Sequence, residues 1–173
     1  MAQQLGPLEL VGGRWVLGDP ARESSLSIML TPEGLEHRRH GETALLATVK
    51  WGQFVSLGVS AAHRNRQTSR TAGFASTFRD LGWGPDGCSL YGDLRHPYER
   101  WSARYTHHER RYPAGHVIVL QALFDQLSAA KALDSLGDPE WLGSAVTELS
   151  SYTSWYGPGG NRLVKEIVRA LGI

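Results

Sequence analysis

The sequence predicts an α+β fold in which a small antiparallel β-barrel or orthogonal sandwich is closed by a helix. Three observations predict it. About seven short segments with strand character lie before residue 106, and turns rich in Gly and Pro separate them. Amphipathic helical patterns follow only after residue 112. Strands that come first and helices that come last are typical of α+β domains rather than of wound α/β sheets.

The strand-rich half is organised around a predicted hairpin within residues 24–62. Leu26, Ile28 and Leu30 alternate with other side chains, which is the period of a half-buried strand. The turn that starts at Thr31 has Pro and Gly at positions that favour chain reversal. The predicted strands, in chain order, cover residues 8–11, 15–17, 25–31, 34–40, 51–61, 74–78 and 88–91.

Two further segments fit either kind of structure. Residues 44–50 fit a short strand or a helical turn. In residues 98–105 the aromatic side chains are spaced by three and four, which fits a helix as well as a strand. The strand predicted over residues 51–61 opens on Trp51. We expect Trp51 and Phe124 to lie in the core.

Helices are predicted for the rest of the chain. Pro113 suits the first position of a helix over residues 113–136, whose apolar residues recur at steps of three and four. The β-branched run at 116–120 also fits a strand that leads into a shorter helix. Asp138 suits the N-cap of a second helix, and Asn161 that of a last one.

One part of the pattern resembles a known family. The segment LSIMLTPEGLEHRR, followed after a gap by VKWGQFVSLGV, resembles the opening of a bacterial pleckstrin-homology-like (PH-like) domain. There a strand, a T-x-x-G turn, a polar return strand and a tryptophan-led segment recur. The resemblance covers residues 8–136 and implies a PH-like barrel with its closing helix in residues 1–137. Residues 138–173 are then a helical extension packed on it. The family implies binding of lipids, peptides or proteins, and it singles out no catalytic residue.

Composition suggests little about a partner. The net charge of the 173 residues is +1, so the overall balance favours no class of ligand. No apolar run approaches the length of a membrane-spanning helix, and the first residues lack the pattern of a secretory signal. We therefore expect a cytoplasmic location. The single cysteine, Cys88, agrees with a reducing compartment. Phosphate-binding glycine motifs are missing from the sequence, and no cofactor is expected.

An enzyme is the alternative function. Cys88 would serve as a nucleophile if a histidine approached it and lowered its pKa. His107 and His108 are the densest titratable pair, but adjacent side chains diverge in a helix or a strand, and the spacing of a metal site is missing. These features favour a solvated turn and a lone buried thiol. We therefore expect a non-enzymatic interaction module that binds a protein, peptide or anionic partner.

Arginines form the predicted binding surface. Arg64, Arg66 and Arg70 lie in the loop 63–70, which has no apolar or acidic residue, and Arg38 and Arg39 lie on the return strand. Such positive groups attract phosphates of nucleic acid or anionic lipid, which is a further alternative function. In an antiparallel meander, the arginines of the loop and those of the return strand lie at opposite rims of the sheet. This geometry argues against nucleic acid and favours a local contact with a protein or an anion.

Overall fold

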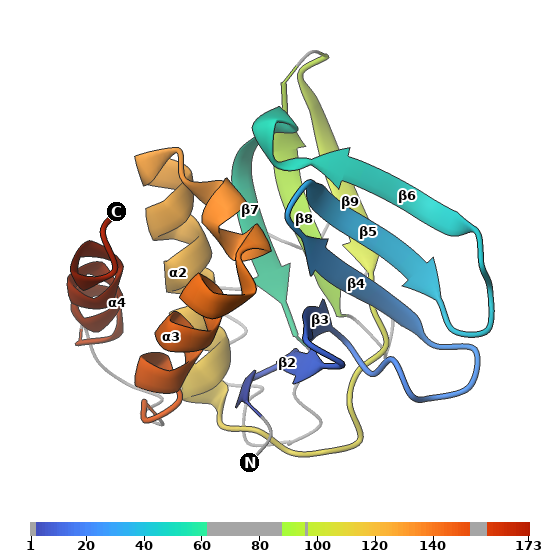
Figure 1. Cartoon of the computed structure of the whole chain (residues 1–173), viewed down its shortest axis with the longest axis horizontal. Helices are drawn as coiled ribbons and strands as arrows, with labels where there is room; N and C mark the ends of the chain where they lie inside the picture. The colour runs from blue at the N-terminus through green and yellow to red at the C-terminus, as the bar shows by residue number, and fades with distance from the viewer. Residues whose placement is uncertain (1–2, 62–87, 96, 153–158) are drawn as a thin grey trace, which may run out of the picture.

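The computed structural model describes residues 3–61, 88–95, 97–152 and 159–173. Within these residues the fold is α+β, with two antiparallel sheets and three α-helices (Figure 1). The predicted α+β class is confirmed. The predicted strand at 74–78 and the arginine loop at 63–70 lie outside the described residues.

The first sheet is a six-stranded meander in which each strand pairs antiparallel with the next. It contains both arms of the predicted hairpin, and residues 44–50 contribute a strand rather than a helical turn. Alternation in the hairpin's first arm buries Ile28 and Leu30. The strands are β1 (Gln4–Leu5), β2 (Leu8–Val11), β3 (Arg14–Leu17), β4 (Leu26–Thr31), β5 (Gly34–Arg39) and β6 (Leu45–Lys50).

The turn between β4 and β5 is held by two residues that the sequence singles out. The Thr31 hydroxyl donates to the Gly34 carbonyl at 2.9 Å and accepts from the Gly34 amide at 3.2 Å. A Cβ at Gly34 would lie 2.1 Å from the Val49 carbonyl oxygen. Only glycine therefore lets β6 approach β5 at this point.

The second sheet is a three-stranded meander of β7 (Phe54–Ser60), β8 (Ser89–Leu94) and β9 (Glu99–Arg104). The strand expected to open on Trp51 begins at Phe54 instead, so that part of the prediction is wrong. Residues Trp51–Gln53 form a short 3-10 helix, η1, because the Trp51 indole turns inward and donates to the Thr31 carbonyl at 2.8 Å. The ambiguous segment at 98–105 is a strand.

The two sheets meet at one corner, beyond the end of β9. The Thr106 amide donates to the Leu26 carbonyl at 2.8 Å, and the Thr106 carbonyl accepts from the Asp19 amide at 3.1 Å. Gly18 lies at this corner with φ +91°, and a Cβ there would lie 3.0 Å from the Thr106 carbonyl oxygen. No closed barrel is found in the part of the chain that the structure describes.

The helical part contains α2 (Ala114–Ala130), a 3-10 helix η4 (Leu133–Gly137), α3 (Pro139–Leu149) and α4 (Gly159–Ala170). The helix expected over 113–136 is thus divided, because Lys131 adopts a left-handed conformation and ends α2. Residues 116–120 are helical. Their β-branched side chains do not form a strand because Val119 and Leu120 belong to the buried face of α2, which packs on β7.

The helix starts were predicted with mixed success. The Asp138 carboxylate accepts from the Glu140 and Trp141 amides at 2.9 and 3.2 Å, as the N-cap prediction requires. The expected cap at Asn161 is wrong, since α4 begins two residues earlier, at Gly159. Gly160 packs against the Tyr152 ring, where a Cβ would lie 3.4 Å from the hydroxyl. Gly160 is thus a buried residue within the first turn of α4.

One hydrophobic cluster joins both sheets and all three α-helices. Trp51 is 6% exposed and Phe124 fully buried, so both core predictions are confirmed. Figure 1 shows α2 beside β7, on which it packs, and α4 on the side of α2 away from the sheets, whereas α3 contacts η4, α4 and β1. Among the helices of the described residues, none has the length and apolarity that crossing a bilayer requires.

Candidate functional site

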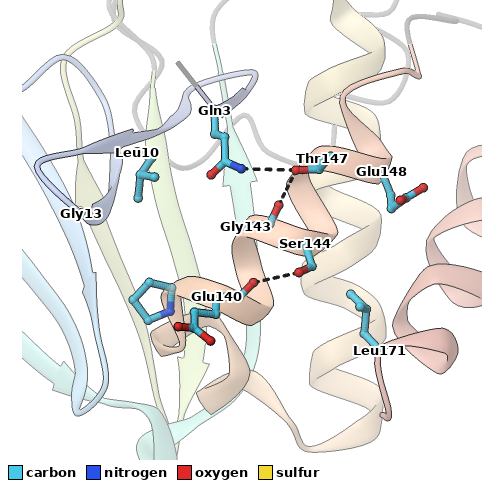
Figure 2. Close-up of a pocket in the computed structure, with 10 residues that line it drawn as sticks. Gln3, Leu10, Gly13, Glu140, Gly143, Ser144, Thr147, Glu148 and Leu171 are labelled. Atoms are coloured by element: carbon cyan, nitrogen blue, oxygen red, sulfur yellow. Dashed lines mark hydrogen bonds between the residues drawn. The ribbon is translucent and has the colours of Figure 1, made fainter. Parts of the chain in front are cut away.

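An open groove lies between the β2–β3 hairpin and α3 (Figure 2). It encloses about 590 Å³, a size within the usual range of ligand sites. The hairpin contributes one wall, α3 the other, and the chain end after α4 closes one side. The lining residues are Gln3, Leu10, Gly13, Pro139, Glu140, Gly143, Ser144, Thr147, Glu148 and Leu171.

Hydrogen bonds hold the two walls in place. The Trp15 indole, on β3, donates to the Pro139 carbonyl at 3.2 Å and fixes the start of α3. The Gln3 amide donates to the Thr147 hydroxyl at 3.4 Å across the other end. Between these two hydrogen bonds α3 carries small residues. At the buried Gly143, an added Cβ would lie 3.5 Å from Gln3 Oε1, which is van der Waals contact, so the helix and the N-terminal segment pack closely there. The groove is therefore preformed by the packing of α3 on the hairpin.

The chemistry of the groove is apolar with a negative rim. Leu10, Pro139 and Leu171 supply apolar surface. Glu140 and Glu148 are exposed, and their eight-residue separation on one helix corresponds to a rise of about 12 Å. Neither carboxylate forms an ion pair with another described residue, and the lining residues include no Lys or Arg. Such a groove suits an apolar group flanked by positive charges.

The predicted arginine surface is only partly described. Arg64, Arg66 and Arg70 lie outside the described residues. The Arg38 guanidinium donates to Glu36 Oε2 at 3.0 Å, and Arg39 forms an ion pair with Glu42 at 3.2 Å. Both carboxylates are local, on β5 and in the turn after it, and they offset the positive charge of this pair. Neither Arg38 nor Arg39 lines the groove at α3.

The predicted histidine pair lies in the segment between β9 and α2, where each ring has a different partner. His107 stacks on the Tyr112 ring at 5.5 Å and shares a hydrogen bond of 3.2 Å with its hydroxyl. His108 is buried, and its Nε2 lies 3.2 Å from the Pro7 carbonyl oxygen. Burial, and then the Arg110 charge, lower the pKa of His108 against the opposing effect of Glu9. The two rings diverge, as their adjacency predicts.

A third histidine, His116, connects the N-terminal strands to the helices. Its Nδ1 accepts from the Gly6 amide at 3.4 Å, so the neutral ring carries its proton on Nε2, which donates to the Ser150 carbonyl at 3.0 Å. Burial is the main cause that lowers the pKa of His116. Its partners are all backbone groups, which is the pattern of a structural histidine.

The thiol of Cys88 is inaccessible. Its side chain is fully buried at the start of β8, beside the phenols of Tyr105 and Tyr112. Burial, and then the charge of an ionised Cys88, raise the pKa of both tyrosines, so these phenols stay protonated. The described residues include no group of three His, Cys, Asp or Glu side chains arranged to hold a metal ion.

The sequence reasoning missed the groove entirely. Its residues come from positions 3–13, 139–148 and 171, which only the packing of α3 brings together. One local signal was available: Glu140, Ser144 and Glu148 recur at steps of four, so they form a polar stripe on one face of a predicted helix. Comparison with protein-family models, curated proteins and solved structures finds no match to this chain.

Proposed function

We propose that this chain is a non-enzymatic interaction module that binds a protein partner through the groove between the β2–β3 hairpin and α3. The observation that carries the proposal is the composition of this groove: an apolar floor and two exposed carboxylates without an ion-pair partner among the described residues. Exposed, unpaired charges beside apolar surface favour association with a complementary partner.

The element order supports a PH-like core for this module. A meander sheet, a second three-stranded sheet and then α2 follow one another in the order that the resemblance implies. The T-x-x-G turn and Trp51 occupy structural positions, at the hairpin tip and in the core. On this proposal the β core is the scaffold, and the binding surface lies on the hairpin and the helical extension.

The charge of the groove selects the partner segment. The backbone positions of Glu140 and Glu148 are separated by a rise of about 12 Å along α3, which matches two cations that are four residues apart on an extended peptide, since such a strand rises about 13 Å over that distance. An aliphatic side chain between them would lie against apolar lining of the groove such as Leu10. A basic segment with a central aliphatic residue is therefore the expected ligand.

A fluorescence-anisotropy titration tests this proposal with a labelled pentapeptide, Arg-Ser-Leu-Ser-Arg, blocked at both ends. Binding should weaken about tenfold in the double variant Glu140→Gln/Glu148→Gln, because each removed ion pair is worth up to about 1 kcal/mol at a surface. Ser144→Phe should also weaken it by filling the groove. Glu99→Gln, an exposed change on β9, is the matched control.

The acidic peptide Glu-Ser-Leu-Ser-Glu should not bind. Equal binding of the two peptides, or an affinity for the basic peptide that is the same in the double variant and the wild type, would contradict the proposal. Raising the salt concentration should weaken binding of the basic peptide, since exposed ion pairs are screened.

A further inference from the structure

A second, smaller cavity of about 250 Å³ lies at the C-terminal end of α2, where η1 and β7 begin. It shares no residue with the groove at α3. Trp51, Phe54 and Val55 form an apolar wall, and two cationic side chains, Arg95 and Lys131, line the same cavity. Val55 is 42% exposed and supplies the accessible part of this wall, whereas Trp51 and Phe54 are buried behind it.

Arg95 is positioned by backbone contacts but has no counter-ion among the described residues. Its amide donates to the Gln53 carbonyl at 2.8 Å, and its Nη2 donates to the Phe54 carbonyl at 3.4 Å. Its Nε is shielded from solvent and has no hydrogen-bond partner. No described carboxylate lies within ion-pair distance of the guanidinium. A shielded cation with unused donors favours an incoming anion.

Lys131 contributes the second positive charge from a fixed backbone position. It is the C-cap residue that directly follows α2. Its φ is +56°, and its amide donates to the carbonyls of Leu127 and Ser128. Two negative contributions oppose the cations: Asp134 lines the cavity, and the C-terminus of α2 carries a partial negative charge of about half a unit.

The balance of these charges selects the ligand. Two cations against one carboxylate and a helix C-terminus leave a small positive excess, enough for a singly charged anion. The desolvation cost of an anion grows roughly with the square of its charge, so this small excess favours a singly charged anion over a doubly charged phosphate. The apolar wall beside Arg95 suits a small hydrocarbon group attached to that anion.

We propose that the cavity at the start of β7 binds a carboxylate that carries a small apolar group. The carboxylate lies against Arg95 and Lys131, and the apolar group lies on Phe54 and Val55. This chemistry is found both in a free organic acid and at the C-terminus of a peptide that ends in an aliphatic residue. The site is independent of the proposed function of the α3 groove.

Nuclear magnetic resonance tests the proposal with N-acetyl-leucine as the probe and N-acetyl-leucinamide as the neutral control. The acid should shift the Nε–H signal of Arg95 and the indole signal of Trp51, and the amide should not. A peptide ending Ala-Ala-Leu with a free carboxylate identifies the source. Tighter binding than the free acid indicates a chain terminus, and equal or weaker binding indicates a small acid.

Three variants test the charge balance. Arg95→Gln should weaken binding of the acid about tenfold, as expected for one charged hydrogen-bond partner. Lys131→Asn removes the second charge but keeps a residue that tolerates the left-handed conformation, and it should weaken binding about threefold. Asp134→Asn should tighten binding, because it removes the repulsive carboxylate.

Arg100→Gln, an exposed change on β9, is the control. Equal shifts with the acid and the amide would overturn the proposal, as would an Asp134→Asn variant that binds the acid more weakly. If Arg95→Gln fails to fold, the opposite effects expected of Lys131→Asn and Asp134→Asn still decide the result.

Discussion

Replacing Trp51 by Phe should destabilise the protein by about 2–4 kcal/mol. The indole is 6% exposed, and its Nε1 donates to the Thr31 carbonyl at 2.8 Å. Losing that buried donor costs about 1–3 kcal/mol, and the smaller ring loses about 1 kcal/mol of apolar burial. The neighbouring backbone cannot easily fill the space, because the Trp51 indole lies against the end of β4 and Gly137.

Urea unfolding followed by circular dichroism measures this change, with an unchanged dependence on urea as the sign that the fold is intact. Trp141→Phe is the matched control. Its indole also donates to a carbonyl, that of Leu171 at 3.3 Å, but the residue is only half-buried. The control should lose about 1 kcal/mol or less. A Trp51→Phe loss no larger than the control's would refute the assignment of this tryptophan as a packed core anchor.

Three further predictions follow from the backbone, the histidines and the thiol. Gly18→Ala should destabilise the fold by about 1–2 kcal/mol more than Gly12→Ala, because both have positive φ but only Gly18 is crowded; equal losses in urea unfolding would contradict this. The pKa values of His37, His108 and His116 are lowered from 6.5, chiefly by burial, so the folded state favours their neutral forms. Protons therefore bind the unfolded chain more readily than the folded one. The free energy of unfolding should have its full value above about pH 6.5 and should fall as the pH falls below that. A urea midpoint that stays constant between about pH 7.5 and 5.5 would refute this reasoning. Finally, Cys88 in the native protein should react slowly with iodoacetamide both at about pH 6 and at about pH 8.5, because the thiol is buried, whereas the unfolded chain should react fast at about pH 8.5, where an ordinary thiol ionises; rapid native alkylation at about pH 6 would favour the enzyme alternative.

The sequence by itself determined the features that depend on neighbouring residues. The hairpin turn needs only Thr31 and Gly34, which lie three residues apart and bond to each other. The start of α3 needs only Asp138, whose carboxylate accepts from the next amides. Strand alternation and helical periodicity identified the α+β class, and aromatic size identified Trp51 and Phe124 as core residues. These interactions form within a turn or a single face, so local sequence carries them.

Tertiary structure alone decided the features that depend on distant residues. Trp51 begins a 3-10 helix rather than a strand because its indole reaches Thr31, twenty positions away. The β-branched run at 116–120 is helical because burial against β7 outweighs its weak preference for strands. The groove joins hairpin residues to α3 and Leu171, and the second cavity joins Arg95 to Lys131. Contacts between such separated segments depend on how whole elements pack, and no local pattern specifies that packing.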